Sequence, residues 1–180
     1  MLRTLIFVCA LLAAPIAGAT EAGWALLRDG GHVVLLRHAY ATGTTDPANV
    51  DPDNCATQRN LSDRGRQQAR KIGALFSARA ADTEKVFSSR YCRAAETARL
   101  AFGSDRAETL AALDPAPAGT EADIAPALDA IRNWNGAGNL VLVTHADVIQ
   151  RLTGSSAREG EALIVVPNGE GLHVLARIVF

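Results

Sequence analysis

Two short apolar runs, each followed at once by a polar and chemically active pair, constrain the fold of this chain more than any other feature. Residues 33–38 read Val-Val-Leu-Leu-Arg-His, and residues 140–145 read Leu-Val-Leu-Val-Thr-His. Short continuous apolar runs are typical of buried strands. In open α/β sheets, ligands bind outside the carboxyl ends of the strands. We therefore expect His38 and His145 to meet at one edge of a sheet.

The rest of the chain alternates between helical and extended patterns. A chain of 180 residues is long enough for one domain with a full core. Long irregular segments are expected at 39–60 and 104–120, where Gly, Pro, Asn and Asp are frequent. Strands alternating with helices predict an α/β fold: a three-layer α/β/α sandwich with a mostly parallel sheet and an antiparallel C-terminal hairpin. The expected helices are 21–29, 62–79, the segment from the 88–93 loop to about 102, 122–134 and 146–152; the expected strands are 32–37, 86–87, 140–144, 162–167 and 172–180.

The first 19 residues have the pattern of a signal peptide. Arg3 supplies a positive start, residues 5–16 are apolar, and Ala17-Gly18-Ala19 fits a small-x-small cleavage site. We expect cleavage after Ala19, a mature domain of residues 20–180 and a periplasmic or secreted location. No stable membrane association is expected after cleavage.

Export would change the chemistry expected of the cysteines. Cys9 would leave with the signal peptide, and Cys55 and Cys92 would remain. An oxidising compartment favours a disulfide between them, with two separate thiols as the alternative. No CxxC pair or close Cys/His cluster is present, so a structural zinc site is not expected.

The charge balance directs attention to local anion binding. The formal net charge is −1 and the sequence pI is about 6.4, so no global field favours nucleic acid as a partner. Arginine side chains hold phosphate oxygens through two-point hydrogen bonds. A neutral imidazole beside them can attack phosphorus and form a phosphohistidine. The pattern of arginines and histidines therefore favours phosphoryl chemistry on a small-molecule phosphate ester.

Four segments resemble one known family. Residues 35–39, Leu-Leu-Arg-His-Ala, resemble its Arg-His-Gly signature with alanine in place of glycine. Residues 88–98 resemble its Ser-Ser-Pro-x-x-Arg-Ala-x-Glu-Thr-Ala segment, with Arg90 in the proline position. Residues 60–69 resemble its Leu-Thr-x-x-Gly-x-x-Gln-Ala helix, and residues 143–145 its second-histidine strand end. The chain thus resembles the histidine phosphatase superfamily, branch 1, and within it small exported bacterial members.

The resemblance implies a phosphoglycerate mutase-like fold and a role for each matching residue. His38 would be the nucleophile, Arg37 and Arg93 would bind phosphoryl oxygens, and His145 would complete the pocket. No cofactor and no metal are implied. The expected activity is that of an exported, metal-independent phosphatase acting on a phosphate monoester. The alternatives are a phosphate- or phosphosugar-binding protein with little or no catalysis, and a phosphotransferase or mutase that uses the same pocket.

The sequence leaves alternatives for two features of the site, the proton donor and the role of Arg90. The proton donor of the mutase-type branch has no counterpart in sequence, which leaves Asp114, Glu121 and Asp147 as candidates. Arg90 would either widen the anionic pocket or face solvent. Loops 39–60 and 104–120 would set specificity, and their small polar residues suggest a polar alcohol such as a sugar. The sequence does not indicate an oligomeric state.

Overall fold

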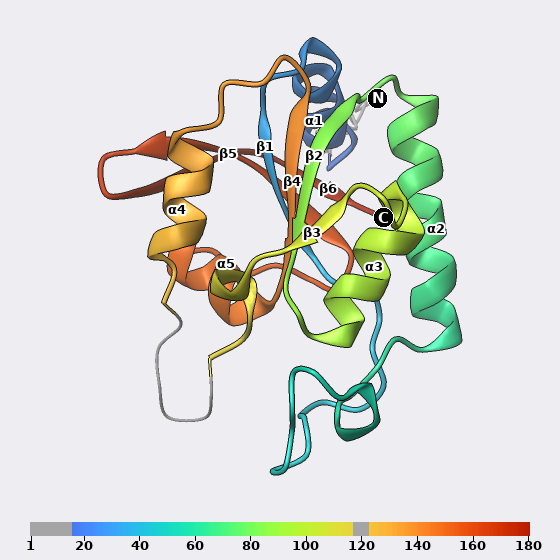
Figure 1. Cartoon of the computed structure of the whole chain (residues 1–180). Coiled ribbons are helices and arrows are strands. Elements are labelled where there is room, and N and C mark those ends of the chain that lie inside the picture. The colour runs from blue at the N-terminus through green and yellow to red at the C-terminus, as the bar shows by residue number, and fades with distance from the viewer. Residues whose placement is uncertain (1–15, 117–122) are drawn as a thin grey trace, which may run out of the picture.

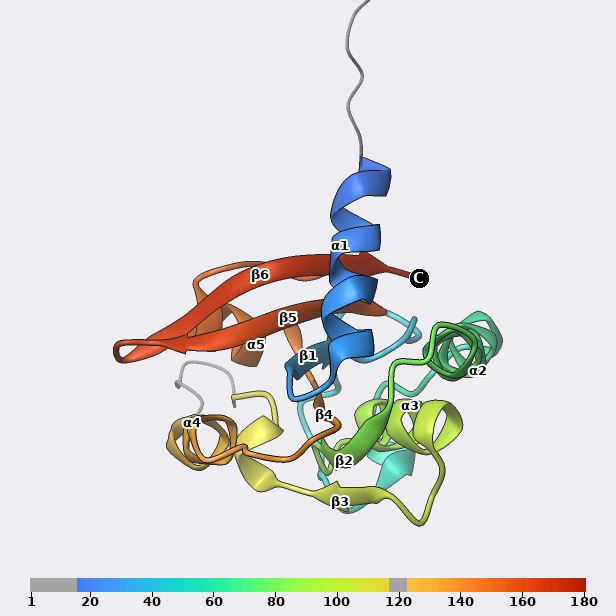
Figure 2. The same cartoon turned by 90° about the horizontal axis from the view of Figure 1, so that it is seen from above.

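A six-stranded mixed sheet lies between two layers of helices (Figure 1). The computed structural model describes residues 16–116 and 123–180. The strand order is β3-β2-β4-β1-β5-β6, which Figure 2 shows from above. This is the three-layer α/β fold that the sequence predicts. The strands are β1 (Val33–Arg37), β2 (Thr83–Ser88), β3 (Ala107–Thr109), β4 (Asn139–Thr144), β5 (Glu161–Asn168) and β6 (Gly171–Val179).

The sheet register brings the two histidine-bearing strand ends to the same level. Strands β1 and β4 are parallel neighbours, and Arg37 lies opposite Thr144. The backbone N–H of His38 donates to the carbonyl of Thr144 at 3.0 Å, so the ladder continues one residue beyond the strands. Strand β2 is parallel to β4 on the far side, and β5 is antiparallel to β1. The carboxyl ends of β1, β2 and β4 therefore form one edge.

Each face of the sheet has its own core. Helices α1 (Ile16–Asp29), α2 (Asp63–Ala78) and α3 (Cys92–Phe102) pack on one face, where Val34 and Val141 are fully buried. Helices α4 (Ala125–Arg132) and α5 (Ala146–Thr153) pack on the other, against Leu35 and Leu142. Alternate residues of a strand point to opposite faces. A strand covered on both faces must then be apolar throughout, as the two runs are.

The start of α2 is fixed by two local features of the sequence. The Ser62 hydroxyl accepts a hydrogen bond from the backbone N–H of Gly65, which caps the helix. A Cβ at Gly65 would lie 1.9 Å from the carbonyl oxygen of Tyr40, so only glycine lets the helix approach the loop that follows β1 so closely. The helix thereby supports the segment that carries His38.

Three element boundaries differ by three residues or more from the sequence-based expectation, and one short strand was not expected. Helix α1 begins at Ile16 rather than 21, and β2 begins at Thr83 rather than 86. Helix α4 begins at Ala125 rather than 122; Pro126 lies in its first turn, the part of a helix that tolerates proline. The segment 104–120, expected to be irregular, contains β3, a short edge strand that depends on pairing with β2.

The expected signal peptide lies almost wholly outside the described residues. Its last four residues, from Ile16, belong to α1, which continues through the expected cleavage point after Ala19. Within the described part of the chain, no helix is both long enough and apolar enough to cross a membrane.

Candidate active site

The four residues expected to form the site do converge at the carboxyl edge of the sheet. His38 follows β1 and His145 follows β4, and their ring centroids are 5.2 Å apart. Both rings are buried, with only 2% and 3% of their surfaces exposed. Arg93 lies in the first turn of α3 and is 4% exposed, while Arg37 ends β1 and is partly exposed.

The backbone fixes the tautomer of His38. Its Nδ1 lies 2.8 Å from the carbonyl oxygen of Ala39. A carbonyl oxygen only accepts hydrogen bonds, so the ring proton belongs on Nδ1 and the Nε2 lone pair is free. Burial, with the nearby charges of Arg93 and Arg37, lowers the pKa of His38 to about 3. The ring is therefore neutral at physiological pH, as a nucleophile must be.

A chain of hydrogen bonds orients His145. The Ser89 hydroxyl lies 2.7 Å from Asp114 Oδ1 and 2.9 Å from His145 Nε2. An ionised carboxylate only accepts hydrogen bonds, so the Ser89 hydroxyl donates to Asp114 and accepts a hydrogen bond from Nε2–H of His145. Complete burial, together with His38, lowers the pKa of His145 well below its usual value. A neutral His145 held this way presents an unprotonated Nδ1.

The two predicted arginines are held by acceptors on neighbouring loops. Arg37 Nη1 donates to the carbonyl of Ala157 at 2.8 Å. Arg93 Nη1 donates to Asp46 Oδ1 at 3.0 Å, and its guanidinium lies 5.0 Å from the ring centre of Tyr91. Burial lowers the pKa of both arginines, although a guanidinium stays charged in proteins. Two fixed cations therefore flank the histidine pair.

Arg59 is a third cation at the site, and the sequence analysis did not assign it. Its Nη2 lies 2.9 Å from Glu159 Oε1, and 13% of its side chain is exposed. The same Glu159 oxygen is 3.8 Å from Arg37 Nη2, and the charge of Arg59 contributes to lowering the pKa of His38 and His145. The available signal was its position in the loop after His38, three residues before the Ser62 helix cap.

Three buried polar atoms lack any hydrogen-bond partner in the part of the chain that the structure describes. They are Arg37 Nε, Arg93 Nε and His145 Nδ1. Buried polar groups are nearly always paired, because an unpaired one costs about 1–3 kcal/mol. All three belong to the residues gathered around His38. The two arginine N–H donors suit an oxyanion, and the unprotonated His145 Nδ1 suits a protonated phosphate oxygen, from which it would accept a hydrogen bond.

A disulfide fastens the loop between β1 and α2 to the start of α3. Cys55 and Cys92 are bonded, with their Cα atoms 5.7 Å apart, which confirms the predicted pairing. Beside it, Gln58 Oε1 accepts the backbone N–H of Cys92 at 2.8 Å. The loop supplies Asp46 and Arg59, and α3 supplies Arg93. The disulfide therefore joins the two segments that build the anion pocket.

The three candidate proton donors have different surroundings. Glu121 lies outside the described residues. Asp114 accepts hydrogen bonds from Ser89 and from the backbone N–H and Nε of Arg90, the last at 2.7 Å. Asp147 is exposed, accepts the backbone N–H of Ala116 at 2.8 Å and lies close enough to Arg37 to affect its pKa. Arg90 follows the second expectation: 41% of its side chain is exposed to solvent, and Asp114 compensates its charge.

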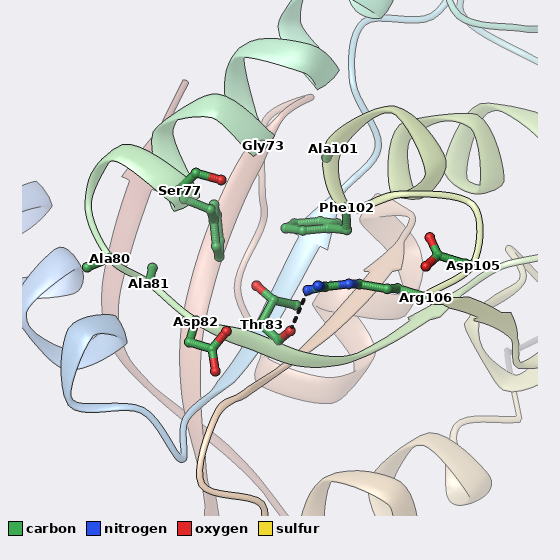
Figure 3. A pocket seen from close by; sticks show the side chains of 11 residues that line it. Gly73, Ser77, Ala80, Ala81, Asp82, Thr83, Ala101, Phe102, Asp105 and Arg106 are labelled. Atoms are coloured by element: carbon green, nitrogen blue, oxygen red, sulfur yellow. Dashed lines mark hydrogen bonds between the residues drawn. The ribbon is translucent and has the colours of Figure 1, made fainter.

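Among the hollows on the surface of the described residues, one lies beside the site and another lies far from it. A groove of about 920 Å³ lies between loops 45–52 and 111–116 and shares Tyr91 and Asp114 with the site. A second cavity, of about 590 Å³, lies near Thr83 at the opposite end of β2, between the ends of α2 and α3 (Figure 3). There Arg106 donates to the carbonyl of Thr83. Nowhere in 16–116 and 123–180 do three or more His, Cys, Asp or Glu residues form a group able to hold a metal ion.

Comparison with known proteins points to one family. Residues 33–115 match the family model of the histidine phosphatase superfamily (branch 1). No curated protein sequence matches the chain. The matched segment includes Arg37, His38 and Arg93; His145 lies beyond it.

Solved structures share the fold at low sequence identity. The protein histidine phosphatase SixA in its tungstate complex is 19% identical with a TM-score of 0.59, over 82% of this chain and 96% of that one. A mycobacterial glucosyl-3-phosphoglycerate phosphatase is 17% identical with a TM-score of 0.58, over 81% and 97%. Phosphoglycerate mutase from Thermus thermophilus is 21% identical with a TM-score of 0.54, over 83% and 99%. The phosphoglycerate mutase-like fold is thereby confirmed.

Proposed function

We propose, because the chain belongs to the histidine phosphatase superfamily (branch 1), that it hydrolyses a phosphate monoester through a phosphohistidine on His38, without a metal ion. The observation that carries this proposal is the set of three unpartnered buried polar atoms around His38, on Arg37, Arg93 and His145. Charge-assisted hydrogen bonds to an oxyanion would satisfy the two arginine donors. No other buried side-chain nitrogen or oxygen of the described residues lacks a partner.

The first chemical step uses the neutral tautomer of His38. The Nε2 lone pair attacks phosphorus and forms a P–N bond while the P–O bond to the alcohol breaks. The departing oxygen takes up a proton as it leaves. Arg37 and Arg93 stabilise the charge on the transferred phosphoryl oxygens. The carbonyl of Ala39, which accepts a hydrogen bond from Nδ1–H, stabilises the positive charge that the ring acquires.

The second step returns the enzyme to its starting state. Water attacks phosphorus, the P–N bond breaks, and the electron pair returns to Nε2 of His38. The water loses one proton to a nearby base, which is the group that gave its proton to the alcohol. Inorganic phosphate then leaves the arginines. No external oxidant, reductant or metal is consumed.

Release of phosphate from p-nitrophenyl phosphate by residues 20–180 tests this proposal. We expect turnover in the presence of a chelator, and a loss of at least about a thousandfold in His38→Ala. His173→Ala is the matched control, because His173 is exposed on β6, away from the site. Phosphate binding without turnover in the wild type would instead favour a binding protein. Equal rates in wild type and His38→Ala would remove His38 from the mechanism.

We propose further that the protein acts in the periplasm or outside the cell. The signal-like residues 1–19 and the Cys55–Cys92 disulfide support this location, since disulfides persist in oxidising compartments. Cleavage after Ala19 would retain Trp24 and Leu27, two large buried side chains of α1. Fractionation followed by mass determination of the mature chain tests the location. A chain that stays in the cytoplasm with residues 1–19 attached would contradict it.

A further inference from the structure

The groove between loops 45–52 and 111–116 is lined in part by residues that contact the candidate phosphate pocket. Tyr91 lines it, and the Tyr91 ring meets the His145 ring edge-on at 5.5 Å between centroids. Two more lining residues contact the site: Asp46 accepts a hydrogen bond from Arg93, and Asp114 accepts one from Ser89. A phosphate ester with its phosphorus at His38 would therefore extend its alcohol into this groove.

The side chains that shape the groove are largely apolar. Both loops contribute small, rigid or branched residues with no side-chain hydrogen-bonding atoms. Those residues include Pro47, Val50 and Pro52 from the first loop and Ala111, Ala112 and Pro115 from the second. A sugar needs side-chain donors and acceptors for its hydroxyls, because each buried hydroxyl without a partner lowers affinity. Such a lining favours an apolar group instead.

The charged groups of the groove already have partners. Arg90 pairs with Asp114 at 2.7 Å, and Asp46 pairs with Arg93 at 3.0 Å. Asp123 Oδ1 accepts the backbone N–H of Ala125 at 3.2 Å. Among the described lining residues, Arg90 is the only cation against three carboxylates. A second phosphate or a carboxylate on the alcohol would therefore meet no free positive charge there and would be repelled.

We infer, resting on the proposed phosphatase function, that the substrate is the monophosphate of an uncharged, largely apolar alcohol or phenol. The phosphoryl group binds among Arg37, Arg93 and His145, and the apolar body lies along Tyr91 in the groove. This assignment differs from the sugar phosphate that the polar composition of the two loops suggests. In the loop 39–60, polar residues such as Asp51, Asn54 and Thr57 hydrogen-bond within the loop itself, whereas the apolar residues named above line the groove.

A series of straight-chain alkyl phosphates tests the inference, because the leaving alcohols have similar acidity. Each methylene that enters the groove should raise kcat/KM about two- to fourfold, since burying one contributes about 0.8 kcal/mol. We expect hexyl phosphate to exceed ethyl phosphate by about tenfold or more. The phosphate ester of 6-hydroxyhexanoate has a chain of the same length with a terminal carboxylate. Its kcat/KM should be well below that of hexyl phosphate. The kcat/KM for glucose 6-phosphate should not exceed that for ethyl phosphate.

A pair of matched variants locates the effect. Val50→Ser removes an apolar side chain from the groove wall and should lower the hexyl-to-ethyl ratio of kcat/KM about threefold or more. Val179→Ser makes the same change at an exposed position of β6 and should leave the ratio unchanged. Circular dichroism of both variants monitors folding, and the ratio itself is independent of the amount of active enzyme.

The outcomes separate this inference from the function on which it rests. No His38-dependent turnover of any ester, including p-nitrophenyl phosphate, would overturn both. Turnover of p-nitrophenyl phosphate with a flat or falling alkyl series, or with preference for glucose 6-phosphate or the carboxylate ester, would overturn this inference alone. A rising series with an unchanged ratio in Val50→Ser would place the apolar subsite elsewhere and would also overturn it.

Discussion

Two residues that depart from the family pattern fit the structure for identifiable reasons. Ala39 replaces the glycine of the Arg-His-Gly signature, and its φ is not positive, so this backbone does not require glycine there. Arg90 replaces a proline, and its backbone N–H donates to Asp114 Oδ1 at 2.8 Å, a bond that proline cannot make. Through Ser89, the same carboxylate orients His145. At the residue scale, arginine at position 90 therefore adds a hydrogen bond that holds Asp114, the carboxylate that orients His145.

Asp147 is the residue we expect to donate the proton to the leaving alcohol. Asp114 already accepts three hydrogen bonds from Ser89 and Arg90, whereas Asp147 accepts one described bond, from the Ala116 backbone. Asp147→Asn should slow the hydrolysis of ethyl phosphate about a hundredfold. It should slow the hydrolysis of p-nitrophenyl phosphate far less, because p-nitrophenolate leaves without a proton. Asp114→Asn should slow both esters alike by disturbing His145. Steady-state kcat for the two esters measures this; equal losses in Asp147→Asn would contradict the assignment.

Arg59 is expected to contribute to phosphate binding through its charge. Removing one charge-assisted hydrogen bond costs about 1.5–3 kcal/mol, so Arg59→Gln should lower kcat/KM about ten- to a hundredfold. Inhibition by inorganic phosphate should weaken in parallel. Arg99→Gln is the control, since Arg99 is an exposed arginine of α3 with 59% of its side chain accessible. If both variants match the wild type, Arg59 serves only to hold Glu159.

At the scale of elements, the sequence predicted what depends on local pattern and missed what depends on pairing. The apolar runs of β1 and β4 and the Ser62 cap of α2 are local signals, and the structure confirms them. Strand β3 has only three residues, none of them buried, and forms because β2 offers it an edge. Arg59 was missed for a related reason. Its role follows from a loop path that brings it to Glu159, 100 residues away in sequence.

The Cys55–Cys92 disulfide should stabilise both the fold and the anion pocket. It closes a loop of 37 residues in sequence separation, for which chain entropy predicts about 3–4 kcal/mol of stabilisation. The Cys55→Ser, Cys92→Ser double variant should lower the free energy of urea unfolding by roughly that amount. It should also raise KM, because Arg59 and Arg93 then lie on segments no longer joined. A count of two free thiols in the native wild type would contradict the bond.

At the scale of the whole molecule, the site is built at the expense of stability in acid. Two histidines are buried beside three arginines, and the groups that approach them most closely are neutral or positively charged. Burial keeps both imidazoles neutral, which is the form that the proposed attack by His38 requires. The same burial means that the folded state does not take up protons which the unfolded chain binds readily. Catalytic readiness and acid sensitivity therefore have one cause.

This coupling predicts how stability depends on pH. In the unfolded chain a histidine titrates near pH 6.5, whereas folding lowers the pKa of His38 to about 3 and that of His145 well below its usual value. Between those pH values the unfolded state binds more protons, so the free energy of unfolding falls as pH drops below about 6.5. Each histidine contributes up to about 1.4 kcal/mol per pH unit. Urea unfolding between pH 7.5 and 4.5 measures the slope.

Replacing one histidine isolates its share of that slope. Glutamine at position 38 cannot titrate. The slope of the unfolding free energy against pH should therefore be smaller in His38→Gln than in the wild type, by up to about 1.4 kcal/mol per pH unit. His173→Gln, at an exposed position of β6, is the matched control for replacing a histidine. Carboxylates that titrate in the same range affect all three proteins equally and cancel in the comparison. Identical slopes for wild type and His38→Gln would mean that His38 takes up a proton in the folded state, which is incompatible with a neutral nucleophile held by Ala39.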